Sequence, residues 1–418
     1  MGVTGIGVCL LCLVQLCIGT ELSETSILYK KRFPLSKWRT EAIEKLWSER
    51  KAMDKTPLVA GPKLNGFPNL EIFYKNESAS RTGSIKHRQA WALFMWAILE
   101  EHIGEKTTVY EVADGNAAVS EAFMARLLGL RFIALVPDDI EKTWTDAIEA
   151  NGGHSLKFPC AQRLTMVKNL TEGKKNRFFM NQYANAERAE DMHESGNDIH
   201  ETTNIFHEIL LQFKSMSNRN APSFFVNSAQ TGGSITSVGR YIQRYNLPTQ
   251  VVLADTEFSI YFDYVVHGAF KNERGDALWV PPGMSGVGHD GQAILGQTTS
   301  LDPAAIDLAI KIPDLASVAA MHYLKSLGIS GGTCSGVNFV ALLHVAARDT
   351  SKRVTVATPI CDSSTPYENT YYNTEWIKTQ FAKHGSFGCW MKAVTKAVEK
   401  GWSPLEIGKY CDEEAMDL

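Results

Sequence analysis

Apolar residues follow two alternating periods along the chain, one typical of β-strands and one typical of helices. Residues 70–74 alternate like a short strand, and the apolar side chains after Lys86 recur at helical spacing. Residues 107–112 are rich in β-branched side chains, residues 117–130 have a helical apolar face, and residues 131–137 predict another strand. The first half of the chain therefore predicts repeated βα units.

The same alternation returns in the second half. Further strands are predicted at residues 223–227, 250–255 and 354–360, and further helices at residues 21–60, 139–150 and 235–245. Strands that alternate with helices form parallel sheets whose faces the helices cover. Residues 262–290 are rich in Gly and Pro without a helical period, and such a long irregular stretch is usually functional.

The length of the chain indicates more than one lobe. The chain has 418 residues, 44% hydrophobic and 21% charged, and its net charge is −4. A single core rarely serves so many residues, so we expect two lobes. The charge balance gives no reason to expect a nucleic-acid partner, and the chain has no zinc-ligand spacing that would predict a metal site.

The N-terminus predicts targeting. Residues 6–18 form an apolar run that is shorter than the 20 or so residues of a membrane span, and small and polar residues follow it. We therefore predict a signal peptide over residues 1–20, no stable membrane span, and a place in the secretory pathway or outside the cell. An uncleaved N-terminal anchor and a cytoplasmic protein are the alternatives.

Two further features bear weakly on secretion. The glycosylation triplets that begin at Asn76 and Asn169 are compatible with a glycoprotein, although such triplets often arise by chance. Cys389 and Cys411 are close enough in sequence to pair within the C-terminal tail, but the spacing of the cysteines does not establish a disulfide.

Lys86 is the residue with the clearest chemical meaning. It lies in Arg-Thr-Gly-Ser-Ile-Lys-His-Arg, a glycine turn that opens directly onto the apolar helix. A desolvated lysine at such a position can bind an aldehyde cofactor. The alternative interpretation is an ordinary surface lysine on a helix. Together with three glycine-rich turns, at residues 114–116, 231–234 and 331–336, it indicates a Schiff-base cofactor that carries a phosphate.

The turn at residues 231–234 follows a strand and opens a helix, where backbone N–H groups bind phosphate. The chain lacks both the nucleotide P-loop pattern and the nicotinamide fingerprint. Asn116 either donates to a cofactor hydroxyl or caps a helix, and Ser363 either bonds a ring nitrogen or is an ordinary turn serine.

The order of these motifs resembles the β-family, or fold-type II, of pyridoxal-phosphate enzymes, over residues 70–376. This family includes cysteine synthase, cystathionine β-synthase and the cysteine desulfhydrases. The motifs of this chain resemble most those of the bacterial-type desulfhydrases. The resemblance is carried by residues 82–88, 118–122, 187–189 and 235–241, by Cys361-Asp362, and by Tyr367 with residues 370–372.

The resemblance implies a set of roles. Lys86 carries the cofactor and moves the α-proton. The expected cofactor contacts are Lys86, Asn116, Gln230, Thr231, Gly232, Gly233, Ser234 and Ser363, and the expected substrate contacts are Asp114, Gly115, Ala117 and Gly288. A neutral serine at the ring nitrogen, the role implied for Ser363, would leave that nitrogen unprotonated.

Two positions depart from the family pattern. Gln230 replaces a glycine, which would cost on the order of 1 kcal/mol if the position needs a positive φ. Asp114 replaces a small hydroxyl residue that binds the substrate carboxylate, and two carboxylates about 4 Å apart repel by roughly 4 kcal/mol at an effective dielectric near 20. We therefore expect cofactor binding to be better preserved than ordinary amino-acid turnover.

The resemblance implies a tryptophan synthase β-like fold with two α/β lobes, parallel sheets covered by helices, and pyridoxal 5′-phosphate in the cleft between the lobes. We expect residues 80–195 to form the smaller lobe, and residues 21–79 plus 196–418 the larger one. The implied activity is a lyase or transferase reaction, β-elimination or β-replacement on cysteine or an O-activated serine, in a homodimer. A serine or threonine deaminase and a catalytically impaired binding or regulatory protein are the alternatives.

Overall fold

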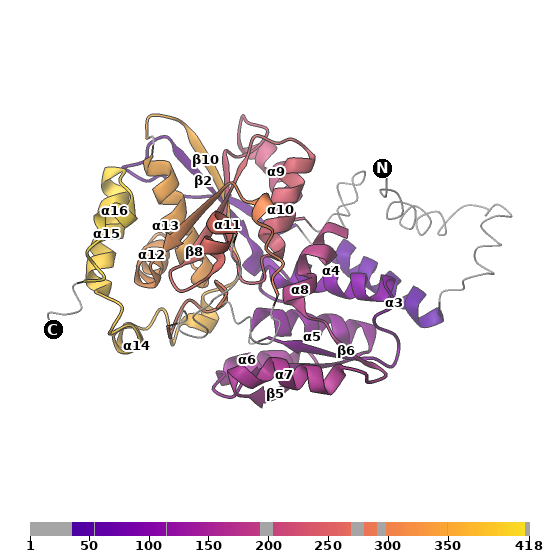
Figure 1. The fold of residues 1–418 in the computed structure, drawn as a ribbon. Helices are drawn as coiled ribbons and strands as arrows, with labels where there is room; N and C mark the ends of the chain where they lie inside the picture. The colour runs from indigo at the N-terminus through magenta and orange to yellow at the C-terminus, as the bar shows by residue number, and fades with distance from the viewer. Residues whose placement is uncertain are drawn as a thin grey trace.

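The computed structural model describes residues 36–53, 55–113, 115–192, 204–268, 280–290, 298–348 and 350–413. The predicted signal peptide, residues 1–20, and the predicted substrate residue Asp114 lie outside the described residues. Two α/β lobes are arranged side by side, as Figure 1 shows and as the sequence predicted.

The smaller lobe is built on a four-stranded parallel sheet in the order β5-β4-β3-β6. Its strands are β3 (Thr108–Val112), β4 (Arg131–Pro137), β5 (His154–Phe158) and β6 (Arg177–Phe179). The first two match the strands read from the sequence, whereas β5 and β6 were not predicted. Both are more exposed than β4, so they lack the apolar runs that mark a buried strand.

Helices cover both faces of this sheet. They are α4 (Lys86–Leu99), α5 (Asn116–Leu128), α6 (Lys142–Ala150), α7 (Cys160–Thr171) and α8 (Gln182–Met192). The apolar cluster of one face contains residues of α4 and α5, and the cluster of the other face joins Val167 of α7 to Tyr110 and Leu135. Twelve of the fourteen residues of α4 are buried. This packing holds the helix that begins at Lys86 in one position.

The N-terminal helix α3 (Lys37–Ala52) corrects the predicted lobe boundary. Ala42, Ile43 and Leu46 of α3 belong to the same apolar cluster as α4 and α5, and Leu46 accepts a hydrogen bond from Trp91 Nε1 at 2.6 Å. The apolar face of α3, predicted as part of the larger lobe, therefore packs on the smaller one, and Arg50 at its end also pairs with Glu208 of the larger lobe at 3.5 Å. The sequence predicted the helix, but an amphipathic pattern does not say which partner a helix covers.

The larger lobe contains a six-stranded sheet in the order β1-β2-β10-β7-β8-β9. Its strands are β1 (Leu58–Ala60), β2 (Leu70–Asn76), β7 (Phe224–Ser228), β8 (Gln250–Thr256), β9 (Leu308–Ile312) and β10 (Val354–Ile360). All neighbours are parallel except β1, which pairs antiparallel with β2 at the edge. The late strand β10 lies between β2 and β7, so the centre of this sheet joins distant parts of the chain.

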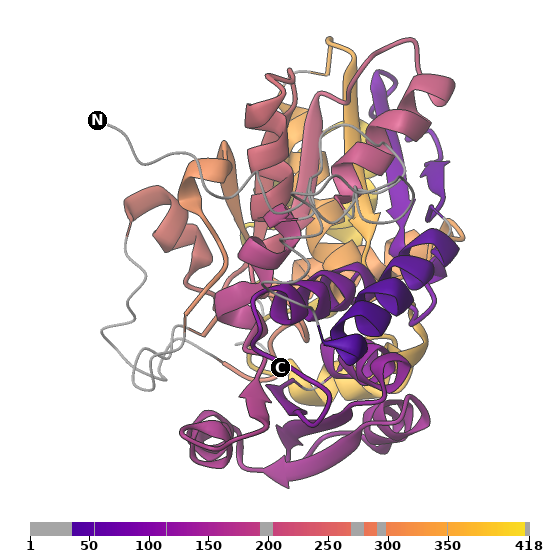
Figure 2. The same ribbon diagram turned by 90° about the vertical axis from the view of Figure 1, so that its right-hand side faces the viewer.

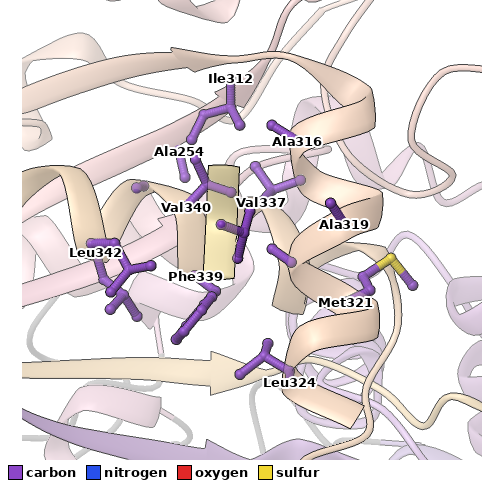
Figure 3. Close-up of a cluster of buried hydrophobic side chains, with 14 of the residues drawn as sticks. Ala254, Ile312, Ala316, Ala319, Met321, Leu324, Val337, Phe339, Val340 and Leu342 are labelled. Atoms are coloured by element: carbon purple, nitrogen blue, oxygen red, sulfur yellow. The ribbon is translucent and has the colours of Figure 1, made fainter. Parts of the chain in front are cut away.

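Helices enclose the larger sheet from both sides, as Figures 1 and 2 show. One side carries α12 (Asp314–Ser326), α13 (Thr333–Ala347), α15 (Phe387–Lys400) and α16 (Pro404–Ile407), and the other carries α9 (Ile205–Met216), α10 (Gly233–Arg244) and α11 (Tyr261–His267). Figure 3 shows that side chains of α12, such as Ala316 and Leu324, and of α13, such as Val337 and Phe339, gather in one buried cluster. This cluster is fully buried and apolar, which explains why α13 carries no polar stripe.

Short elements complete the described chain. They are α14 (Thr374–Gln380) and the 3₁₀ turns η2 (Glu77–Ala79), η5 (Pro303–Ala305) and η6 (Thr365–Tyr367). The helix α11 corrects the prediction that the chain is irregular from residue 262 onwards. Residues 280–290 do lack regular structure, and residues 269–279 lie outside the described residues.

A disulfide joins Cys389, in the first turn of α15, to Cys411 near the end of the described chain. The pairing that the sequence left open is thus made in the structure. Among the helices that the structure describes, none is both long and apolar enough to cross a bilayer.

Candidate active site

A cleft between the two lobes contains most of the residues that the sequence selected. Its cavity volume is about 160 Å³. The predicted residues that line it are Lys86, Gly115, Asn116, Ala117, Gln230, Thr231, Gly232 and Ser234. Lys86 is the first residue of α4, and the others follow the carboxyl ends of β3 and β7. The carboxyl ends of parallel strands are where α/β proteins bind ligands.

Lys86 occupies the first position of α4, immediately after a turn in which Gly83 has φ +77°. The N–H of Ile85 donates to the carbonyl of Cys361 at 2.7 Å and so ties this turn to the end of β10. Lys86 Nζ donates to Gln89 Oε1 at 2.8 Å. Burial lowers the pKa of the Lys86 ammonium, which favours the free amine that attacks an aldehyde.

A directional series of hydrogen bonds leads from Lys86 into the smaller lobe. Gln89 Nε2 donates to Gln182 Oε1 at 3.1 Å, and the backbone N–H of Gln182 donates to Glu111 Oε2 at 2.9 Å. Burial raises the pKa of Glu111 to about 8, and burial also raises the pKa of nearby Glu121. Two protonatable carboxyl groups therefore lie buried behind the lysine, and the sequence patterns did not indicate them.

The loop between β7 and α10 forms a cradle for an anion. Gly232 has φ +87°, and a Cβ atom at this position would overlap the backbone of Leu301. Gly233, the first residue of α10, packs against Ala186 with no room for a side chain. Gly233 does not line the cavity, but its position leaves the N–H groups of the first helical turn available to a phosphate.

Gln230 fits this loop without the backbone strain that we expected. The positive φ of the loop falls on Gly232, and Gln230 is not among the described residues with a positive φ. The carbonyl of Gln230 accepts a hydrogen bond from the hydroxyl of Tyr261 at 2.7 Å. Replacing glycine with glutamine at this position therefore leaves the cradle intact.

Asn116 and the end of β10 meet across the cleft. Asn116 Nδ2 donates to Asp362 Oδ2 at 2.7 Å, and the hydroxyl of Tyr367 donates to the same oxygen at 2.7 Å. Asp362 and Cys361 line the cavity, whereas their neighbour Ser363, which the sequence selected, does not. The resemblance located this turn of the chain, but backbone direction decides which of its side chains enters the cleft.

Gly288 also lies beside the cleft and not in its lining. Its φ is +83°, and its N–H donates to the carbonyl of Ala229 at 2.7 Å, so it supports the first residue of the cradle loop. Ser285 and Gly286 of the same segment do line the cavity.

The sequence reasoning missed several lining residues. Those with chemically distinctive side chains are Trp144, Arg163, Gln182, Cys334, Cys361 and Asp362. Only Cys334, Cys361 and Asp362 lay within segments that the sequence had marked, namely the third glycine-rich turn and the end of the last strand. The described residues contain no group of three or more His, Cys, Asp or Glu side chains arranged to hold a metal ion.

These features fit a phosphate-bearing aldehyde cofactor. Lys86 offers a desolvated amine, the cradle offers backbone donors on a loop where a Cβ atom at Gly232 would overlap Leu301, and Asn116 offers an amide in the lining of the cleft. The described residues would thus hold pyridoxal phosphate through Lys86, Asn116 and residues 230–234.

Comparison with known proteins agrees with this chemistry. Residues 50–362 match the family model described as pyridoxal-phosphate dependent enzyme. A protein of Caenorhabditis elegans described as pyridoxal-phosphate dependent is 41% identical over 91% of this chain and 91% of its own length. The L-cysteine desulfhydrase of Mycobacterium tuberculosis is 30% identical over 82% of this chain and 90% of its own length.

A solved structure shares the fold. O-ureido-L-serine synthase has a TM-score of 0.62 and 22% sequence identity, and the match covers 81% of this chain and 95% of that enzyme. The chain belongs to the family of pyridoxal-phosphate dependent enzymes, and pyridoxal 5′-phosphate is its cofactor.

Proposed function

We propose that this enzyme removes the thiol group of cysteine by β-elimination and releases sulfide, pyruvate and ammonia. The observation that carries the proposal is the position of Lys86, whose half-buried side chain lies in the cleft beside the phosphate cradle. The similarity to an L-cysteine desulfhydrase over most of both chains supports cysteine as the substrate.

The residues of the cleft have different roles in this reaction. Pyridoxal phosphate, when bound, supplies an electron sink that makes the α-proton of an amino acid acidic. Lys86 takes that proton, because its lowered pKa keeps more of the lysine in the basic form. Gln89 accepts a hydrogen bond from Lys86 Nζ and thereby orients the amine.

β-Replacement on an O-activated serine is the second candidate. Arg163 of α7 lines the cleft, and an arginine side chain pairs well with a carboxylate. A substrate or nucleophile with a second carboxylate would fit such a cleft. This candidate predicts that an incoming amino acid or sulfide is consumed and that no pyruvate is formed.

The experiment that separates these reactions measures every product. Purified protein with pyridoxal phosphate and cysteine is assayed for sulfide and pyruvate, and a parallel reaction offers O-acetylserine with sulfide. We expect sulfide and pyruvate in equal amounts from cysteine, and a loss of about 10²–10⁴-fold in Lys86→Ala. Cysteine formation from O-acetylserine without pyruvate would instead identify a synthase.

Asp114 provides the test against a catalytically impaired protein. Ala113 and Gly115, which flank Asp114, line the cleft. If Asp114 obstructs the substrate carboxylate, Asp114→Ser should raise turnover of cysteine. If Asp114 recognises the native substrate, the same change should lower turnover. Cofactor binding without turnover of any amino acid, in both forms of the protein, would favour a binding or regulatory role.

A further inference from the structure

The carboxyl group of Asp362 is the one acidic side chain among the described residues that line the cleft. It follows the end of β10, and only 4% of the residue is exposed. A buried carboxylate is costly unless it meets hydrogen-bond donors or a positive charge. The role of this group therefore depends on what it faces when the cleft is filled.

The structure fixes the position of the Asp362 carboxyl group. Its Oδ2 accepts hydrogen bonds from Asn116 Nδ2 and from the hydroxyl of Tyr367, each at 2.7 Å. Gly332 packs so closely on the other side that a Cβ atom there would overlap Oδ1. The N–H of Gly332 also donates to the carbonyl of Asp362 at 3.3 Å. The carboxyl group is thus held by three separate elements and cannot turn freely out of the cleft.

The negative charge of the Asp362 carboxylate restricts which group of the cofactor it can face. The phosphate and the ring oxygen of pyridoxal phosphate are negative, and so is the carboxylate of an amino-acid substrate, so each would repel Asp362. Two groups that can carry a positive charge remain, the nitrogen carried by Lys86 and the ring nitrogen, which is cationic when it is protonated. Lys86 Nζ donates to Gln89 Oε1 at 2.8 Å, whereas the Asp362 carboxyl group is bonded to Asn116 and Tyr367. The ring nitrogen is therefore the matching partner.

We propose that Asp362, and not Ser363, faces the ring nitrogen of pyridoxal phosphate and keeps that nitrogen protonated. A protonated ring withdraws electrons more strongly than a neutral one, so this enzyme would have a stronger electron sink than a serine at this site allows. The inference rests on the cofactor and on the position of Asp362, and it does not require cysteine to be the substrate.

The groups around Asp362 are compatible with this pairing. Burial raises the pKa of the Tyr367 hydroxyl well above its usual value, so Tyr367 remains a neutral donor. A hydrogen bond with Cys334 and burial raise the pKa of the Cys361 thiol, so Cys361 also remains neutral. Asn116 is uncharged. The negative charge available to the ring nitrogen on this wall therefore comes from Asp362.

The test reads the protonation state of the cofactor directly. Holoenzyme is prepared with pyridoxal phosphate labelled with ¹⁵N in the ring, and the ¹⁵N chemical shift is followed from pH 6 to pH 9. The variants are Asp362→Ser and Asp362→Asn, and the matched control is Ser363→Ala. Cofactor affinity is measured by titration in every protein.

We expect the wild type and Ser363→Ala to show a pyridinium shift across the whole pH range. Asp362→Ser should show a neutral ring and bind the cofactor about 10–100-fold more weakly, the loss typical of a hydrogen bond to a charged group. A neutral ring nitrogen in the wild type would overturn the proposal, and this reading needs no variant to fold. A neutral ring in Ser363→Ala would overturn it as well.

The outcomes also distinguish this inference from the proposed reaction. A pyridinium ring in an enzyme that releases no sulfide from cysteine supports the inference and contradicts the substrate. Release of sulfide by an enzyme with a neutral ring supports the substrate and contradicts the inference.

Discussion

Asn116 Nδ2 and Asp362 Oδ2 are 2.7 Å apart and join the two lobes across the cleft. Asn116 is the first residue of α5 in the smaller lobe. Asp362 follows β10, the last strand of the larger lobe. The two residues are 246 positions apart in sequence. Each lobe therefore contributes one partner to the wall that faces the cofactor.

The Asp362 carboxyl group should make the stability of the cofactor-free protein depend on pH. Burial raises its pKa to about 6. An unfolded aspartate ionises near pH 4, so the folded state binds more protons between about pH 4 and pH 6 and loses stability as the pH rises through that window. Urea unfolding at pH 7 should show Asp362→Asn to be more stable than the wild type by on the order of 1–3 kcal/mol.

At pH 4.5 this difference should shrink, because the folded wild-type carboxyl group is then protonated. With cofactor bound, the order at pH 7 should reverse if the ring nitrogen supplies the missing positive charge. An equal difference at both pH values would show that charge is not the cause.

Gly232→Ala should damage the phosphate cradle. The residue has φ +87°, and the new Cβ atom would overlap the backbone of Leu301. The left-handed backbone alone costs roughly 1–2 kcal/mol, and the overlap displaces the loop. We expect a loss of stability above about 2 kcal/mol and a loss of cofactor affinity, measured by urea unfolding and by absorbance titration.

Gly268→Ala is the matched control, because Gly268 has φ +71° with no atom within 4 Å of the added Cβ. It should lose only the backbone contribution and keep its affinity for the cofactor. Equal losses of affinity in both variants would contradict the assignment of the cradle.

Glu208 should be essential for the stability of the helix start that presents Lys86. It accepts hydrogen bonds from Lys75 Nζ at 2.8 Å and from Arg88 Nη1 at 3.2 Å, and its side chain is 3% exposed. Burial alone would raise the pKa of Glu208, but the charges of Arg88 and Lys75 outweigh burial and lower it to about 2. Glu208→Gln removes the carboxylate that pairs with buried Lys75, whereas Arg88 keeps its pair with Glu77, and the change should destabilise the protein by on the order of 3–5 kcal/mol.

The contribution of Glu208 should be complete above about pH 4.5, where an unfolded glutamate is ionised, and it should fall as the pH drops toward 2. Glu71→Gln breaks the exposed pair with Arg353 and is the control, with an expected change below about 1 kcal/mol. Urea unfolding at pH 7 compares the two variants, and similar losses in both would refute a special role for burial.

The Cys389–Cys411 disulfide should stabilise the C-terminal segment against unfolding. It closes a loop with a sequence separation of 22, and a loop of this length corresponds to about 3 kcal/mol in the chain-entropy model. The double variant with serine at both positions should lose about that amount in denaturant unfolding under oxidising conditions. Cys160→Ser, which changes an exposed free thiol, should have no such effect. A dithiol reductant should destabilise the wild type and leave the double variant unchanged.

We propose that the protein enters the secretory pathway, and the accessibility of its two glycosylation triplets gives a test. Asn169 is exposed on α7, whereas Asn76 is partly buried at the end of β2, where its Oδ1 accepts a hydrogen bond from Ser78 at 2.6 Å. On expression of the full chain in animal cells, glycosidase treatment should reduce the mass of the wild type. Asn169→Gln should remove most of that shift, and Asn76→Gln should remove little. A wild type with no glycan at all would contradict secretory targeting.

The amphipathic and apolar periods of the sequence predicted the strands β2, β3, β4, β7, β8 and β10 and the helices α3, α4, α5, α6 and α10. These elements are buried on one or both faces, so their side chains must follow the strand or helix period. The exposed strands β5 and β6 carry a weak pattern and could not be found in this way. The helix α3 was predicted, but its packing on the smaller lobe depends on a complementary surface that no local pattern describes.

The same division holds for the site. Lys86 and the cradle at residues 231–234 were found from sequence because glycine turns that open helices have a local signature. Asp362, Gln182 and Arg163 have no such signature, and they reach the cleft only because sheet order and helix packing bring these parts of β10, α8 and α7 to the cleft that Lys86 lines. The sequence by itself thus determined the cofactor chemistry, whereas the tertiary structure decided which charged side chains surround it. Whether two residues face each other across a cleft depends on how distant segments of the chain pack together. The local pattern of apolar residues does not specify that packing.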